Sequence, residues 1–210
     1  SSGCSAYNYT PPGKGGNGGG AVRIEASGRV TVDGTIIADG DNSPSSSYTA
    51  AAGSGGGISI RCASFTGAGT VRARGGQTVP YGAGRTGAGG GGRVAVVYDP
   101  VEQSNAPMPS VTFDVGGESG GPEPFSYSEP GSLYLTDTRF LSSSTLITNS
   151  FALVFRDPTN WVGNDLTVTN AWVKFPTNFA VAFTNTLKIS GTNTRVDFVA
   201  PTLLHCQNLV

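Results

Sequence analysis

The chain has 210 residues, of which 32 are glycine and only 13% are charged, and its formal net charge is −1. Because no run of like charges occurs, the sequence offers no electrostatic surface for nucleic acid or an anionic membrane, and no apolar stretch is long enough to span a bilayer. The β-branched runs between the glycine-rich stretches indicate a folded all-β protein rather than a disordered chain.

The first repeat unit begins after a polar segment. Residues 1–20 are rich in glycine, proline and serine and have no periodic apolar residues, so we expect a surface loop there. Short strands are then predicted at 21–26, 29–32 and 35–38, because apolar residues alternate with polar ones and turn residues separate the three stretches. A polar, glycine-rich loop at 39–57 completes the unit.

The same pattern recurs along the first two thirds of the chain. In each unit a glycine run leads into a strand with two apolar residues that we expect to face inward, namely Val22/Ile24, Ile58/Ile60, Val94/Val96 and Leu133/Leu135. Successive units are 36, 36 and 39 residues apart. A fixed period with variable filler is typical of a repeat architecture.

Beyond residue 133 the glycine-rich loops stop and the period shortens to 20–22 residues. Similar strands begin at leucines, and their partners end in phenylalanines, so we predict that the inward ladder continues through Leu146, Leu166, Leu187 and Leu209 and through Leu153/Phe155, Val173/Phe175 and Val196/Phe198. A further strand, at 180–183, is expected to have its counterpart near 203–206. Three strands of about five residues with tight corners make one turn of a three-sided parallel β-helix, in which like residues stack about 4.8 Å apart.

The predicted fold is therefore an all-β, right-handed three-sided parallel β-helix, or β-solenoid. A sandwich or barrel would also give short strands, but neither requires residue matching at one period. We divide the chain into a loop at 1–20, long turns with glycine-rich loops inserted at one corner at 21–132, and short turns at 133–210, all in one continuous solenoid.

Four stretches carry a resemblance to known proteins. Residues 18–26 and 30–40 resemble the glycine-rich β-helical repeats of very large secreted or surface-attached bacterial proteins, and residues 164–170 and 185–191 resemble the shorter repeats of adhesin and autotransporter-passenger solenoids. The resemblance implies a right-handed parallel β-helix and an extracellular or cell-surface location. It implies no single activity and supplies no catalytic residues. The proline-rich stretch at 101–110 departs from the pattern and leaves the register of the third turn open.

Three cysteines are too few for a disulfide scaffold. Cys62 stands where Ala26 and Tyr98 stand in the neighbouring units, so we interpret it as a buried, reduced thiol. A bridge between Cys4 and Cys206 of neighbouring chains stays open. For the last strand, either His205 or Cys206 faces inward, and the small apolar cysteine is the better occupant.

No residue is assigned a catalytic or cofactor-binding role. The only histidine, His205, lacks the Gly-x-Ser-x-Gly motif or the cysteine arrangement of a hydrolase. Asp39 and Asp41 are weak Ca²⁺ candidates, because carboxylates are calcium ligands, but Asp-Gly and Asp-Asn pairs are also ordinary turn chemistry. Arginines such as Arg72 and Arg74 could serve a polysaccharide lyase, although outward arginines are expected on any solenoid.

The loops offer candidates for modification and for sugar contacts. Asn8 lies in the single Asn-x-Ser/Thr sequon, and the tyrosines of the loops could stack on sugars or pack against the wall; they are Tyr7, Tyr9, Tyr48 and Tyr81.

We therefore predict a non-catalytic structural module of an extracellular or cell-surface protein, serving as a stalk, an adhesin shaft or a filament building block. The alternative is a glycan-binding or polysaccharide-cleaving β-helix that uses the loop-bearing side, which exposed carboxylates about 5–10 Å apart would favour. Neither end carries a cap, so we expect a longer chain or end-to-end stacking of copies.

Overall fold

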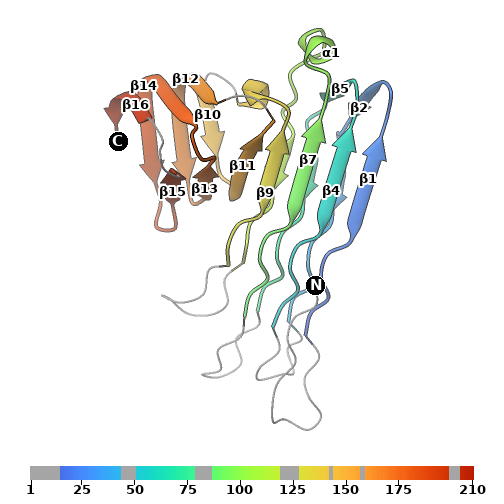
Figure 1. Cartoon of the computed structure of the whole chain (residues 1–210). Coiled ribbons are helices and arrows are strands. Elements are labelled where there is room, and N and C mark those ends of the chain that lie inside the picture. Colours follow the sequence, from blue (N-terminus) through green and yellow to red (C-terminus); the bar gives the residue numbers. More distant parts are fainter. Residues whose placement is uncertain are drawn as a thin grey trace.

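The computed structural model describes residues 15–43, 51–78, 87–118, 128–141, 144–156, 159–198 and 204–210. They form an all-β structure whose sheets are parallel throughout. The largest sheet has seven strands, which lie side by side in chain order in Figure 1: β1 (Ala21–Glu25), β4 (Gly57–Arg61), β7 (Arg93–Val97), β9 (Ser132–Leu135), β11 (Phe151–Phe155), β13 (Trp172–Phe175) and β15 (Arg195–Phe198).

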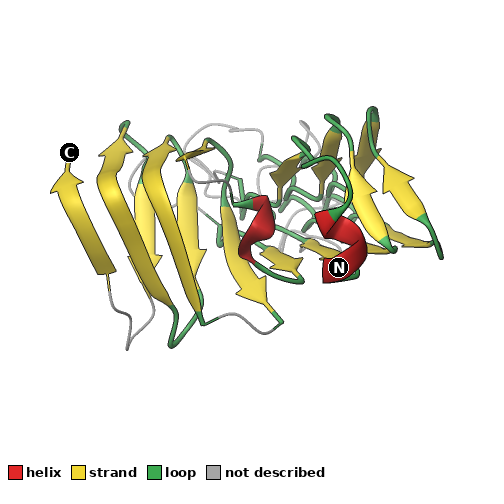
Figure 2. Cartoon of the chain, turned by 90° about the horizontal axis from the view of Figure 1, so that it is seen from above, coloured by secondary structure: helices red, strands yellow, loops and turns green. Residues whose placement is uncertain are grey.

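Three smaller sheets follow the same rule, in which each strand pairs with its counterpart one repeat later. One sheet holds β10 (Ser144–Ile147), β12 (Asn160–Thr169), β14 (Ala180–Ser190) and β16 (Leu204–Leu209). The second holds β3 (Thr35–Ile37), β6 (Thr70–Arg72) and β8 (Thr112–Asp114), and the third pairs β2 (Arg29–Thr31) with β5 (Ser64–Thr66). Two short helical segments, α1 (Pro100–Ser104) and the 3-10 helix η1 (Thr138–Phe140), follow β7 and β9 (Figure 2).

The register of the large sheet matches the period of the sequence over its first four strands. Val22 lies opposite Ile58, and Ile58 lies opposite Val94 and Val94 opposite Leu133. The second row runs in the same way from Ile24 to Leu135, which lies opposite Val96. Residues with the same inward position therefore stack in columns, because a parallel strand keeps its alternation from one repeat to the next.

Two of the predicted pairings in the short-period region are wrong. Leu146 lies opposite Thr167, and Thr145 instead occupies the row of Leu166 and Leu187, because the next residue of that strand, Ile147, is buried in the Val168 row and fixes the alternation.

The second wrong pairing is that of β11 with β13. Leu153 and Phe155 continue the rows of Leu133 and Leu135, but on its other edge β11 places Phe151, not Leu153, opposite Val173. Phe151 is buried and supplies an additional inward position at the start of the strand, which the leucine and phenylalanine spacing concealed. Beyond this step the rows are regular again, since Val173 lies opposite Val196 and Phe175 opposite Phe198.

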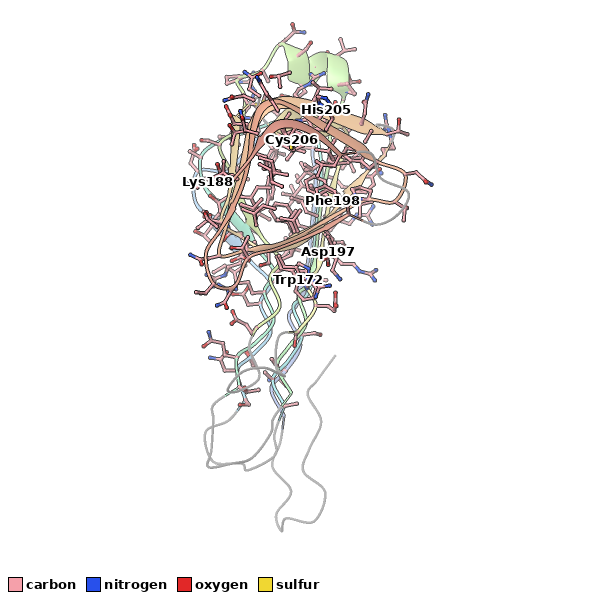
Figure 3. All side chains as sticks on the ribbon, turned by 90° about the vertical axis from the view of Figure 1, so that its left-hand side faces the viewer. Trp172, Lys188, Asp197, Phe198, His205 and Cys206 are labelled. Carbon is pink, nitrogen blue, oxygen red and sulfur yellow. The ribbon has the colours of Figure 1, made fainter. Side chains whose placement is uncertain are left out.

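The core is a row of apolar side chains between the strand layers, seen along the stack in Figure 3. Aromatic rings fill its C-terminal part: Phe175 stacks on Phe198 with centroids 5.1 Å apart, and Trp161 meets Phe183 edge to face at 5.1 Å. Such pairs stabilise the stack beyond the area they bury.

Glycine-rich segments form a two-layer structure below the sheets in Figure 1. We call this structure the glycine extension. One layer contains the segments that leave β3, β6 and β8, and the other contains the segments that enter β1, β4, β7 and β9; their ranges are 38–43, 73–78, 115–118, and 15–20, 51–56, 87–92, 128–131.

Backbone hydrogen bonds join the glycine extension in two directions. The N–H groups of Ala52 and Gly55 donate to the next segment of the same layer, and those of Gly53 and Gly56 donate across to the other layer. The pattern repeats after three residues, the period of extended polyproline-II-type backbone, which has no hydrogen bonds of its own. In the part of the chain that the structure describes, the glycine segments are therefore hydrogen-bonded layers rather than irregular loops.

Candidate functional site

An ion-pair network connects successive repeats where the glycine extension meets the sheets. Arg72 pairs with Asp39 at 2.6 Å, and the backbone N–H of Arg74 donates to the same carboxylate at 2.8 Å. The Arg74 guanidinium pairs with Asp114 at 3.5 Å and with Glu118. The hydrogen bond to Asp39 raises the pKa of Arg72, so this arginine stays charged. Arg72 and Arg74, the candidate lyase residues, are therefore held by carboxylates of their own chain.

The weak calcium candidates also have partners within the chain. Asp39 accepts hydrogen bonds from Arg72 and from the backbone of Arg74, and Asp41 accepts one from the side-chain amide of Asn17 at 2.8 Å. Among the described residues, no group of three or more histidine, cysteine, aspartate or glutamate side chains could hold a metal ion.

A polar groove of about 410 Å³ opens beside this network, and we call it the Trp172 groove. Its residues come from the glycine extension, from the outer face of the large sheet and from the corner before β15: Arg74, Gly117, Glu118, Ser128, Pro130, Ser150, Asn170, Trp172, Thr192, Asn193, Thr194 and Arg195. Figure 3 shows Trp172 and its neighbour Asp197 on the outside of the strand layer, next to the start of the glycine extension.

Trp172 is held by charged side chains of β13 and β15. Its indole N–H donates to Asp197 at 2.8 Å, and Arg195 donates to the other oxygen of that carboxylate at 2.8 Å. The cations of Arg195 and Lys174 lie over the indole ring, at 4.4 and 4.6 Å from its centroid. Burial alone would raise the pKa of Asp197, but the hydrogen bonds from Arg195 and Trp172 outweigh it and hold that pKa below its usual range.

The corner that borders the groove has a fixed backbone. Asn170 adopts φ of +50° and Gly191 φ of +101°, in the left-handed region that asparagine and glycine tolerate best. The backbone N–H of Asn170 donates to the Thr194 hydroxyl at 2.8 Å. A Cβ atom on Gly191 would lie 2.3 Å from the Asn170 side-chain oxygen, so a larger residue there would displace that side chain as well as strain the backbone.

Most ladder residues lie in the core, where their role is packing. Those with 2% exposure or less are Ile58, Ile60, Val94, Val96, Leu133, Leu135, Leu153, Leu166, Val173, Phe175 and Leu187, while Val22, Ile24, Phe155, Val196 and Phe198 are partly buried and pack against them. These residues form columns rather than a binding surface.

Of the cysteines and the histidine, Cys62, Cys206 and His205 lie in the described part of the chain. Cys62 is buried, and burial raises the pKa of its thiol; Cys206 lies opposite Phe183 and is a free thiol. His205 lies opposite Ala182 and is exposed, in agreement with the alignment that places Cys206 inward (Figure 3). Cys4, the sequon at Asn8 and the loop tyrosines Tyr7, Tyr9, Tyr48 and Tyr81 lie outside the described residues.

The Trp172 groove was not predicted from the sequence. Its residues are spread from Arg74 to Arg195 at spacings that follow no motif or period, so only the stacking of the second to seventh units brings them together.

No protein-family model, no curated protein and no solved structure matches the chain. Within the described residues, no helix is long and apolar enough to cross a bilayer.

Proposed function

We propose that the chain is a right-handed three-sided parallel β-helix and serves as a non-catalytic structural module of an extracellular or cell-surface protein, as a stalk, an adhesin shaft or a filament building block. The observation that carries this proposal is the seven-stranded parallel sheet, in which every strand pairs with the strand one repeat later. Such stacking gives a body whose length follows the number of repeats.

The glycine extension supports a structural role. Successive long repeats add segments to both layers, joined to their neighbours by backbone hydrogen bonds such as Gly16 N–H to Ala51 and Gly55 N–H to Gly90. The ion pairs of Arg72 and Arg74 also join one repeat to the next. Contacts between neighbouring repeats thus stabilise both the sheets and the extension.

The end strands of the large sheet are suited to further stacking. Among the described residues, β1 and β15 each have one edge without a strand partner, and unpaired edges accept additional strands. We propose that further turns, from a longer chain or from another copy, cover these edges.

Removing one whole turn tests the proposal. Deletion of residues 59–94 joins Ile58 to Ala95 and leaves a strand in which Ile58 and Val96 keep their inward positions, because Ile58 and Val94 are equivalent. Since each turn of a solenoid contacts mainly its neighbours, we expect this variant to unfold cooperatively on heating. In this variant, spin labels on Arg23 and Arg195 should lie closer together along the stack than in the unmodified chain by about 4.8 Å, one strand spacing.

A matched control is deletion of residues 59–93, which removes one residue fewer than the first deletion. It joins Ile58 to Val94 and moves Val94 and Val96 to the outward face, so we expect loss of the cooperative transition. Equal disruption by both deletions would contradict a modular shaft, and so would an unchanged label distance in a folded in-register variant.

A further inference from the structure

We propose that the Trp172 groove binds a neutral oligosaccharide. This inference goes beyond the structural role, because a shaft needs no ligand, and it stands on the groove alone. The groove holds about 410 Å³, within the range of small-molecule sites in proteins.

The side chains that line the groove are held by contacts within the chain. Arg74 and Glu118 belong to the ion-pair network, Trp172 is fixed by its hydrogen bond to Asp197, and the corner is fixed by the fit of Asn170 against Gly191. A ligand would therefore meet polar groups that are already positioned, which lowers the entropic cost of binding.

Several polar side chains at the corner are open to a ligand. Asn193 and Thr192 are exposed, and neither side chain has a hydrogen-bond partner among the described residues; the same holds for the side-chain amide of Asn170. The Nε atom of Arg74, another residue of the lining, is buried without a hydrogen-bond partner among the described residues. An amide offers a donor and an acceptor close together, and a hydroxyl offers both in one atom. Adjacent hydroxyl groups of a sugar present the same alternation of donors and acceptors, so a sugar residue can satisfy both kinds of atom.

The charges of the groove favour an uncharged ligand. Arg74 is paired through its terminal nitrogens with Asp114 and Glu118, and Arg195 is paired with Asp197, so each of these charged groups already has an ion-pair partner of opposite sign. Because Arg195 and Lys174 lie over the Trp172 ring, we expect recognition by hydrogen bonds at the corner rather than by stacking on the indole.

The test begins with the purified chain on an array of immobilised oligosaccharides that includes neutral hexose and N-acetylhexosamine oligomers beside uronate- and sialate-containing ones. We expect binding to neutral members, and titration calorimetry with the strongest of them should show affinity about tenfold lower for Asn193→Ala and for Thr192→Ala, the loss expected for one or two hydrogen bonds.

Asn160→Ala is the matched control, because Asn160 is exposed, has no side-chain partner among the described residues and does not border the groove. It should bind like the unmodified chain, and all three variants should unfold at unchanged temperatures. The proposal is overturned if the array shows no neutral glycan bound, if acidic members alone are bound, or if Asn193→Ala and Thr192→Ala bind as tightly as the control. None of these results would affect the turn-deletion test of the shaft.

Discussion

At the scale of single residues, the glycines of the extension are required by the close spacing of its segments, both within a layer and between the two layers. A Cβ atom on Gly53 would lie 1.8 Å from the backbone oxygen of Asn17, and one on Gly19 would lie 2.1 Å from that of Ala38. Both obstacles are backbone atoms of the neighbouring segments, so neither can turn aside as a side chain could. Glycine is needed here for close approach, while its conformational freedom matters at Gly191.

Gly53→Ala should destabilise the protein by about 3 kcal/mol, because the added methyl group forces segments 15–20 and 51–56 of one layer apart and breaks the hydrogen bonds between them. The measurement is urea-induced unfolding followed by circular dichroism. Gly20→Ala is the control in the same layer: nothing lies within 4 Å of its Cβ position, so we expect no loss, and a gain of up to about 1 kcal/mol. Similar losses for both variants would argue against this close packing of neighbouring segments.

The sequence showed where the glycines are but not how they pack. Within the runs Gly18–Gly20 and Gly55–Gly57, the structure shows that Gly19, Gly55 and Gly56 lie against backbone atoms of other segments. The three-residue period of hydrogen bonds could not be read from them, because it depends on which segment of the other layer lies opposite each residue.

At the scale of elements, the short helix α1 replaces a strand. Its residue Gln103 is 2% exposed and makes both backbone hydrogen bonds that a strand neighbour would offer to Phe65: its side-chain oxygen accepts from the Phe65 N–H at 2.7 Å, and its amide donates to the Phe65 carbonyl at 3.0 Å. Asp99 caps the helix by accepting from the N–H groups of Val101 and Glu102.

Gln103→Leu should therefore cost about 2–4 kcal/mol of stability, because it leaves a buried donor and a buried acceptor of Phe65 unpaired. Leucine is at least as good a helix former as glutamine, so lost helix propensity would not explain the effect. Thermal or urea unfolding measures the change, with Val101→Ala as a control on the exposed side of the same helix. A Gln103→Leu protein as stable as that control would contradict this role.

The element boundaries were predictable where the alternation was strong. The strands expected at 21–26, 29–32 and 35–38 correspond to β1, β2 and β3 within a residue or two. The proline-rich stretch at 101–110 gave no strand signal and contains most of α1, whose contact with Phe65 depends on a residue 38 positions earlier. The wrong register at Leu146 arose for a related reason, since the burial of Ile147 decides that alternation.

At the scale of the whole molecule, the column of residues from Val22 to Leu133 follows directly from the sequence period, because parallel pairing converts a period into a stack. The Trp172 groove had no such signal. It joins Arg74, Glu118, Trp172 and Asn193, whose spacing follows no period, and its shape depends on where the glycine extension meets the sheet.

The most direct test of the stacked architecture measures distances between spin labels on outward residues of the large sheet by pulsed electron resonance. Arg23 on β1 and Val154 on β11 are four strand steps apart, or about 19 Å along the stack, and Arg23 and Arg195 on β15 are six steps apart, or about 29 Å. We expect the distance from Arg23 to Arg195 to be longer than that from Arg23 to Val154 by about 10 Å, before allowance for the label arms. A distance from Arg23 to Arg195 equal to or shorter than that from Arg23 to Val154 would contradict this expectation.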